Sequence, residues 1–124
     1  MTLAPPPPLV FDQVTKRYGA TLAVDRLSLA FPPARTTALL GPSGCGKSTL
    51  LRLATGLALP DGGEVRLFGD SVATRGIDEV RHRIGYVIQE GGLFPHLDVE
   101  ANVTLVARHL RWAPARIAAR GISC

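Results

Sequence analysis

The amino-acid sequence predicts an α/β fold, and three observations support that prediction. Short segments in which apolar and polar residues alternate are separated by turns rich in glycine and proline. One β-branched and apolar run, 36–40, leads directly into a glycine-rich loop, after which apolar residues recur at helical spacing. A second helical pattern begins at Asp98, a residue type that caps helices. With 124 residues, the chain suits one small domain or part of a larger one.

Five segments have the pattern of strands, and three have that of helices. The expected strands are 9–14, 27–31, 36–40, 64–68 and 84–88. The expected helices run from Ser48 to near Gly56, from Asp98 to about Trp112, and over 115–120. Residues 36–40 carry no charge and end at Gly41, so we expect that strand to be buried. Residues 1–8 contain four consecutive prolines and predict a stiff leader, which leaves 9–124 for the domain.

Composition narrows the functional classes. The net charge of +4 comes from twelve arginines and two lysines against ten acidic residues. Such a charge can attract nucleotide phosphates, nucleic acid or anionic lipid, but no block of five like charges occurs, which favours a solvated surface. No apolar run approaches the roughly 20 residues of a membrane span. Cys45 and Cys124 form neither a disulfide framework nor a metal-ligand spacing, and they favour a reducing, cytoplasmic setting.

The glycine-rich loop has the pattern G-x-x-x-x-G-K-[ST]. Its glycines permit backbone angles that other residues avoid, so that consecutive N–H groups can point inward and bind an anion. A helix that starts at the end of the loop adds its positive dipole end. Lys47 can reach the β- and γ-phosphates of a nucleotide, and the Ser48 hydroxyl can ligate Mg²⁺. The candidate nucleotide-binding residues are Gly41, Pro42, Ser43, Gly44, Cys45, Gly46, Lys47, Ser48 and Thr49. The alternative is a glycine-rich turn with an incidental lysine.

Residues 41–49, Gly-Pro-Ser-Gly-Cys-Gly-Lys-Ser-Thr, resemble the Walker A loop of ATP-binding-cassette (ABC) ATPases. Tyr18 lies upstream where that family places an aromatic residue that stacks on adenine, and Gln89 matches its Q-loop glutamine. Taken alone, Tyr18 fits a turn residue packed on the core, and Gln89 a polar strand end. The resemblance covers about residues 9–120 and implies ATP and Mg²⁺ as ligands. It also implies that Lys47 and Gln89 are catalytic and that Ser48 and Gln89 contact the metal.

The resemblance also implies partners and a location. Residues 90–97 would face the transmembrane permease subunits of an importer, and a second ATP-binding subunit would complete a dimer. The subunit would be cytoplasmic and peripheral to the inner face of the membrane. Residues 84–96, Ile-Gly-Tyr-Val-Ile-Gln-Glu-Gly-Gly-Leu-Phe-Pro-His, are similar to importers of glycine betaine and related quaternary amines, and Tyr-Val-Ile-Gln-Glu-Gly-Gly is the more specific part.

Several motifs of the family are not found in this sequence. No Leu-Ser-Gly-Gly-Gln signature occurs, and Asp78-Glu79 does not follow the apolar run of a Walker B motif. His82, His96 and His109 precede the position of the family's switch histidine, and we interpret them as surface or loop residues. We therefore expect ATP binding with little or no turnover from the chain alone, and a truncated, frame-shifted or fragmentary product.

The prediction is an incomplete P-loop NTPase of ABC ATPase type. It comprises an N-terminal antiparallel β meander, a partial P-loop core and the start of a helical subdomain. The leading function is ATP binding as part of an ABC importer's ATPase subunit. Two alternatives stay open: a non-catalytic nucleotide-binding or regulatory fragment, and a nucleic-acid binder suggested only by the arginines. We expect no nucleic-acid partner.

Overall fold

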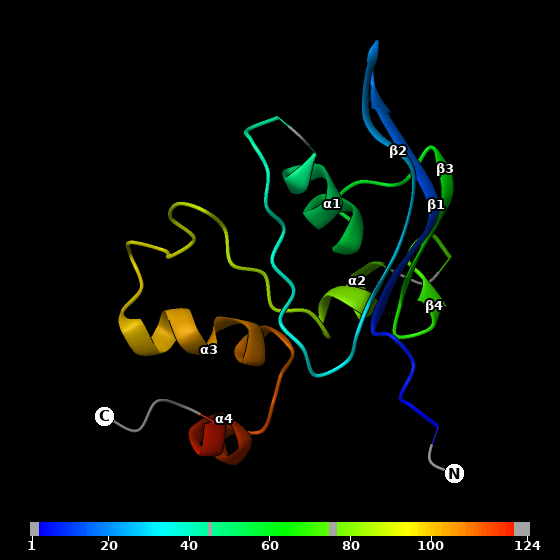
Figure 1. Ribbon diagram of the computed structural model, residues 1–124. Coiled ribbons are helices and arrows are strands. Elements are labelled where there is room, and N and C mark those ends of the chain that lie inside the picture. The colour runs from blue at the N-terminus through cyan, green and yellow to red at the C-terminus, as the bar shows by residue number, and fades with distance from the viewer. Residues whose placement is uncertain (1–2, 45, 75–76, 121–124) are drawn as a thin grey trace. The chain divides into compact units, whose positions relative to one another are not determined.

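The computed structural model describes residues 3–44, 46–74 and 77–120. The chain divides into two compact units, residues 1–86 and 87–124, and each is described by itself. The first unit holds a sheet, a helix packed on it and the glycine-rich loop, and the second holds two helices (Figure 1). The expected α/β class with an antiparallel meander is confirmed.

The sheet of the first unit is antiparallel and follows from local pairing. Its strands are β1 (Leu9–Tyr18), β2 (Thr21–Phe31), β3 (Gly62–Leu67) and β4 (Asp70–Ser71), in the order β2-β1-β3-β4. A tight turn joins β1 to β2, so that Tyr18 pairs with Thr21 and Leu9 with Phe31. Both strands are longer than the alternation predicts, because the ladder continues through polar residues once the hairpin is formed.

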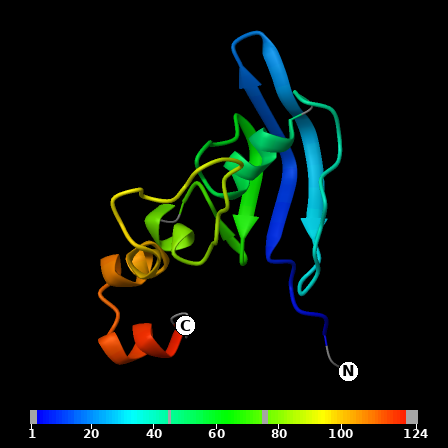
Figure 2. The same cartoon turned by 90° about the vertical axis from the view of Figure 1, so that its left-hand side faces the viewer.

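Helix α1 (Lys47–Ala54) packs against β2 and β3 (Figure 2). Its Leu53 is fully buried in a core whose other members come from the strands or the turn after β4. Those members are Phe11, Val14, Val24, Val65, Leu67 and Val72. Burying one leucine side chain of this kind stabilises a fold by about 1.5–3 kcal/mol. This small core therefore fixes α1, and with it the end of the glycine-rich loop.

Two expected strands do not form, and this corrects the prediction. Residues 36–40 and 84–88 have no strand conformation, and Leu40 and Val87 are 91% and 94% exposed. A strand needs a neighbour to satisfy its backbone N–H and C=O groups, and the sheet includes neither segment. The five-residue helix α2 (Ile77–Arg81) and the short strand β4 were not expected either.

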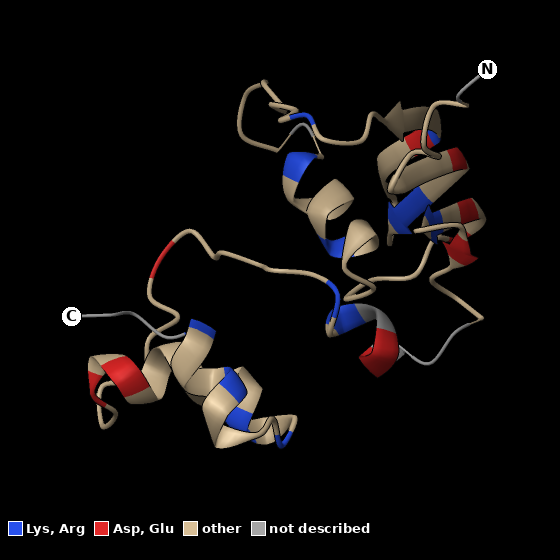
Figure 3. Cartoon of the chain, turned by 90° about the horizontal axis from the view of Figure 1, so that it is seen from below, with Lys and Arg blue, Asp and Glu red and all other residues tan. Residues whose placement is uncertain are grey.

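The second unit confirms the two expected helices near the end of the chain. Helix α3 (Val99–His109) begins where predicted, because the Asp98 carboxylate accepts the backbone N–H of Ala101 at 2.7 Å. It ends three residues before Trp112, and α4 (Pro114–Arg120) starts with proline in the first helical position. In Figure 3 the acidic residues of this unit lie before α3 and at its start, while arginines lie at its end and in α4. This order favours the helix dipole of α3.

Candidate functional site

Two glycines of the glycine-rich loop have left-handed backbone conformations. Gly44 and Gly46 have φ angles of 82° and 97°, in the left-handed region that favours glycine. A Cβ atom at Gly46 would lie 2.8 Å from the carbonyl oxygen of Ala23, so residue 46 is a glycine for space as well as for conformation. Cys45, also predicted to contact phosphate, lies outside the described residues.

The start of α1 supplies backbone donors. Gly46 is the N-cap residue, and α1 has no side-chain cap among the residues that the structure describes. The N–H of Leu50 donates to the carbonyl oxygen of the N-cap residue Gly46 at 3.0 Å. The N–H groups at the first positions of an α-helix, here residues 47–49, have no partner in the regular helical bonding pattern. No acidic residue occupies the first turn. These donors and the helix dipole together favour an anion at this position.

Lys47 lies across the loop. Its ammonium group donates to the carbonyl oxygen of Gly41 and, at 3.2 Å, to that of Pro42. The positive charge is therefore held at the loop that is predicted to bind phosphate. Ser48 is exposed, and Thr49 is half-buried. Gly41, Pro42 and Ser43 form the exposed N-terminal part of the loop.

Tyr18 lies at the same end of the sheet as the loop. Gly46 approaches Ala23, and the strand register places Ala23 between the partners of Lys16 and Arg17, next to Tyr18. Figures 1 and 2 both show the start of α1 towards the hairpin end of β1 and β2. Tyr18 is 46% exposed. This aromatic residue and the start of α1 thus lie towards the same end of the sheet.

A cavity of about 430 Å³ lies behind the loop. Lys47 and Ser48 line it at one side, together with apolar residues of β1, β2, α1 and the segment 36–40. The other lining residues are Leu9, Phe11, Phe31, Thr37, Leu39, Leu50, Leu51 and Ala54. The apolar wall shows that residues 36–40 run beside the sheet and α1 without filling the space between them.

The family model for ABC transporters matches residues 24–122. The chain belongs to the ABC transporter family. It is 45% identical over 111 residues to the Fe(3+) ions import ATP-binding protein FbpC 2 of Rhodococcus jostii, covering 89% of this chain and 32% of that protein. It is 41% identical over 107 residues to the glycine betaine uptake system ATP-binding protein YehX of Escherichia coli, covering 86% and 35%.

A solved ATP-binding subunit of an ABC transporter has the same fold, with a TM-score of 0.76 and 24% identity. That match covers 86% of this chain and 44% of the solved one. The chain therefore spans about a third of the length of these two curated relatives and less than half of the solved subunit. Of the helices that the structure describes, none has the length and apolar character needed to cross a membrane.

The remaining ABC-type residues lie in the second unit. Gln89 and residues 90–96 are exposed, as the predicted contacts with a ligand or a permease require. Gln89 and Ser48 belong to different units, so their meeting at one Mg²⁺ stays a prediction. His82, His96 and His109 are exposed, which confirms their interpretation as surface residues.

Asn102 is a residue that motif reasoning missed. Its Oδ1 accepts the N–H of Phe94 at 2.8 Å, and its Nδ2 donates to the carbonyls of Phe94, Leu97 and Asp98 at 3.2, 3.0 and 2.9 Å. One side chain on α3 therefore holds much of the segment predicted to face the permease. The sequence signal is weak, since an asparagine inside a helix seldom has a role that spacing can reveal.

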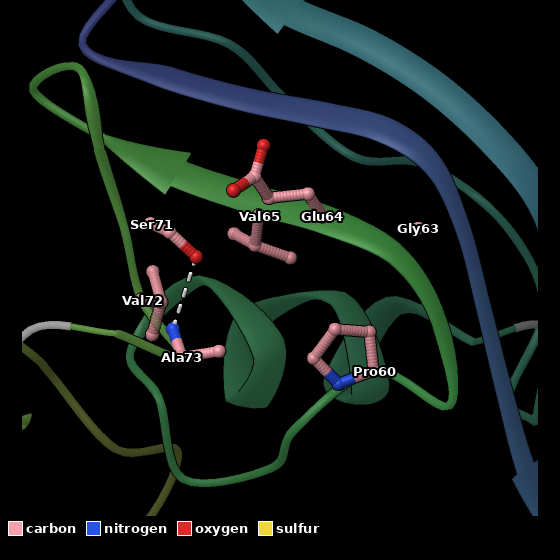
Figure 4. Close-up of a pocket in the computed structure, with 7 residues that line it drawn as sticks. All are labelled: Pro60, Gly63, Glu64, Val65, Ser71, Val72 and Ala73. Atoms are coloured by element: carbon pink, nitrogen blue, oxygen red, sulfur yellow. Dashed lines mark hydrogen bonds between the residues drawn. The ribbon is translucent and has the colours of Figure 1, made fainter.

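A smaller hollow of about 230 Å³ lies beside β3 and β4 (Figure 4). Its lining includes Val65 and Ser71, whose hydroxyl accepts the N–H of Ala73 at 3.4 Å. Glu64 also lines it, and hydrogen bonds from Arg66 and Ser71 hold the pKa of Glu64 below its ordinary value. No residue predicted from the motifs lies here. Among the described residues no group of three or more His, Cys, Asp or Glu could hold a metal.

Proposed function

We propose that this chain binds Mg-ATP as the N-terminal part of the ATP-binding subunit of an ABC importer. The observation that supports it is the left-handed backbone of Gly44 and Gly46 at the start of α1, with the Lys47 ammonium held at the same loop. The first turn of α1 carries no acidic residue, so its N–H groups and dipole favour a bound phosphate.

The residues have separate roles in this proposal. The backbone of residues 41–49 binds the phosphate oxygens, and Lys47 moves from its own loop carbonyls to the β- and γ-phosphates. Ser48 and Gln89 hold Mg²⁺, which neutralises charge on the phosphates when it is bound. Tyr18 stacks on the adenine, and Gln89 orients the attacking water.

Residues 90–97 contact the permease, and a second ATP-binding subunit completes the dimer at the inner face of the membrane. Relatives carry the names of importers for iron(III), glycine betaine, spermidine or putrescine, and choline. We propose quaternary amines as the cargo of the transporter, on the similarity of residues 84–96.

Titration calorimetry with Mg-ATP tests the binding step. Lys47→Ala should weaken binding about a hundredfold, the order expected when a charge-assisted hydrogen bond to phosphate is lost. Arg52→Ala is the matched control, because it removes one exposed positive charge from the last turn of the same helix. Equal affinity of the two variants would exclude nucleotide in this loop. Saturating Mg-ATP should also slow maleimide labelling of Cys45 relative to Cys124.

A further inference from the structure

Asp61 is tied to the end of β1, immediately before Tyr18. Its backbone N–H donates to the carbonyl of Thr15 at 2.8 Å. Its Oδ2 accepts the N–H of Arg17 at 2.7 Å, and its Oδ1 lies 3.5 Å from the ammonium of Lys16. The bond from Arg17 is the main cause that lowers the pKa of Asp61, so this carboxylate is ionised at neutral pH. Asp61 therefore contacts three consecutive residues of β1.

Lys16 connects Asp61 with the aromatic ring of Tyr18. Its ammonium lies 5.2 Å from the centroid of the Tyr18 ring, within the range of a cation–π contact. The Lys16 side chain is only 15% exposed, whereas the carboxylate that anchors it is 49% exposed. Because the aliphatic part of Lys16 is buried and its ammonium is paired with Asp61, few side-chain rotamers remain accessible to Lys16. It can therefore restrict the orientation of the neighbouring Tyr18 ring.

This arrangement lies at the end of the sheet where the phosphate loop ends. The close approach of Gly46 to Ala23 puts the start of α1 opposite Lys16 and Arg17 in the strand register. A nucleotide whose phosphates lie in the loop would therefore have its base near the hairpin. The Lys16 ammonium lies over one face of the Tyr18 ring, and Tyr18 is 46% exposed, so we expect a base to stack on the other face.

We propose that Lys16 and Asp61 are positioning residues for the base of the nucleotide. Asp61 holds the Lys16 ammonium over one face of the Tyr18 ring, and the ring, so oriented, stacks on a purine with its other face. The inference rests on the proposed function, since it assumes triphosphate in the loop. A ring ordered before binding loses less conformational freedom when the base arrives, which raises affinity for the base alone.

Two ligands with the same phosphates separate this role from a general effect of charge. Mg-ATP has a base, and Mg-tripolyphosphate has none. Lys16→Met and Asp61→Asn should each weaken Mg-ATP about two- to fivefold, the usual range for one cation–π contact, and leave Mg-tripolyphosphate unchanged. Lys16→Arg keeps the cation and should restore the affinity for Mg-ATP. In a Tyr18→Ala background, Lys16→Met should cause no further loss.

Arg26→Met is the matched control, since it removes a 77% exposed positive charge from β2 and should alter neither ligand. Equal weakening of both ligands by Lys16→Met, or no change in either, would overturn the inference while Lys47-dependent binding still supported the proposed function. Binding that does not depend on Lys47 would instead overturn the proposed function. A further measurement needs no variant: absence of a nuclear Overhauser effect between Lys16 Hε and the Tyr18 ring in the nucleotide-free chain would also exclude this arrangement.

Discussion

Strand β3 and the segment 36–40 are both short, and both contain β-branched and apolar residues, yet they differ greatly as structures. Strand β3 begins with two glycines and includes Glu64 and Arg66, whereas residues 36–40 carry no charge and lead into Gly41. Strand β3 pairs with β1 and β4, and its Val65 is 2% exposed. Residues 36–40 pair with nothing in the sheet, and Leu40 is 91% exposed. The difference shows that a neighbouring strand, more than the segment's own residues, decides whether a strand forms.

The neighbours of β3 are close at hand, because an antiparallel sheet is built from hairpins and short connections. The segment 84–88 repeats the behaviour of 36–40, with Val87 94% exposed. Curated relatives of this chain are about three times as long as the part it matches. We propose that strands from such additional sequence would cover both segments, and the following predictions test this comparison from the largest expected effect to the smallest.

The largest effect concerns turnover. The chain alone should release phosphate from ATP no faster than its Lys47→Ala variant. Losing one transition-state contact costs roughly 10²–10³ in rate, and the signature sequence is one of several groups not found here. Coexpression with the C-terminal two-thirds of the Rhodococcus jostii relative should restore Lys47-dependent turnover. Multiple turnover by the 124-residue chain alone would show that this account of the missing groups is wrong.

Two leucine substitutions compare how much the packed core of the first unit and the segment 36–40 each contribute to stability. Leu53→Ala should lower the free energy of unfolding by about 2–5 kcal/mol, because it opens a cavity in the core of the first unit. Leu40→Ala should change it by less than about 0.5 kcal/mol, because that side chain is exposed. Urea unfolding followed by circular dichroism gives both values. Similar losses for the two variants would mean that residues 36–40 are packed in solution.

The sequence predicted the parts that depend on neighbours in the chain. The hairpin strands, the start of α1 after its loop and the Asp98 cap all follow from local patterns, and the structure has them. The two failed strands depend on partners that local sequence cannot supply. For the site, the motif predicted the glycine-rich loop before α1, and two of its glycines have left-handed conformations. The contacts of Asp61 and Asn102 were missed, because they join residues whose relation is set only by folding.

Side-chain hydrogen bonds can order a backbone segment that does not belong to a sheet. Asn102 provides a test of this in the second unit. Asn102→Ala removes the acceptor of the Phe94 N–H. Exchange of that amide hydrogen should become about tenfold faster, as expected for one lost hydrogen bond worth roughly 1–1.5 kcal/mol. Val103→Ala, the next residue on α3 and 52% exposed, should leave it unchanged. Residue-resolved hydrogen exchange measures the rate for the Phe94 amide. Equal rates in Asn102→Ala and the native chain would show that the Asn102 side chain does not protect it.

The smallest expected effect is on the stability of the first unit at acid pH. It distinguishes a carboxylate bonded to a backbone N–H, Asp61, from one paired with a side chain, Glu64. The pKa of Asp61 is lowered first by the backbone N–H of Arg17, and that of Glu64 first by the Arg66 side chain. A carboxylate with a depressed pKa in the folded state contributes stability above its unfolded pKa and loses it as pH falls through the folded value. Both contributions should therefore be complete above about pH 4–5 and decline below that.

Salt should distinguish the two carboxylates. High salt screens the ion pair between the half-buried side chains of Glu64 and Arg66, which are 2.7 Å apart, more than it weakens a short bond to a backbone N–H. In low salt, Asp61→Asn and Glu64→Gln should each flatten the loss of stability at acid pH. The Debye length in 1 M NaCl is about 3 Å, so ion pairs are strongly screened. Under that condition Glu64→Gln should hardly change the loss of stability at acid pH, whereas Asp61→Asn should still flatten it. Thermal unfolding from pH 2 to 6 measures the stability of each variant. If Asp61→Asn did not alter the loss of stability at low pH, the hydrogen bond between Asp61 and β1 would not persist in solution.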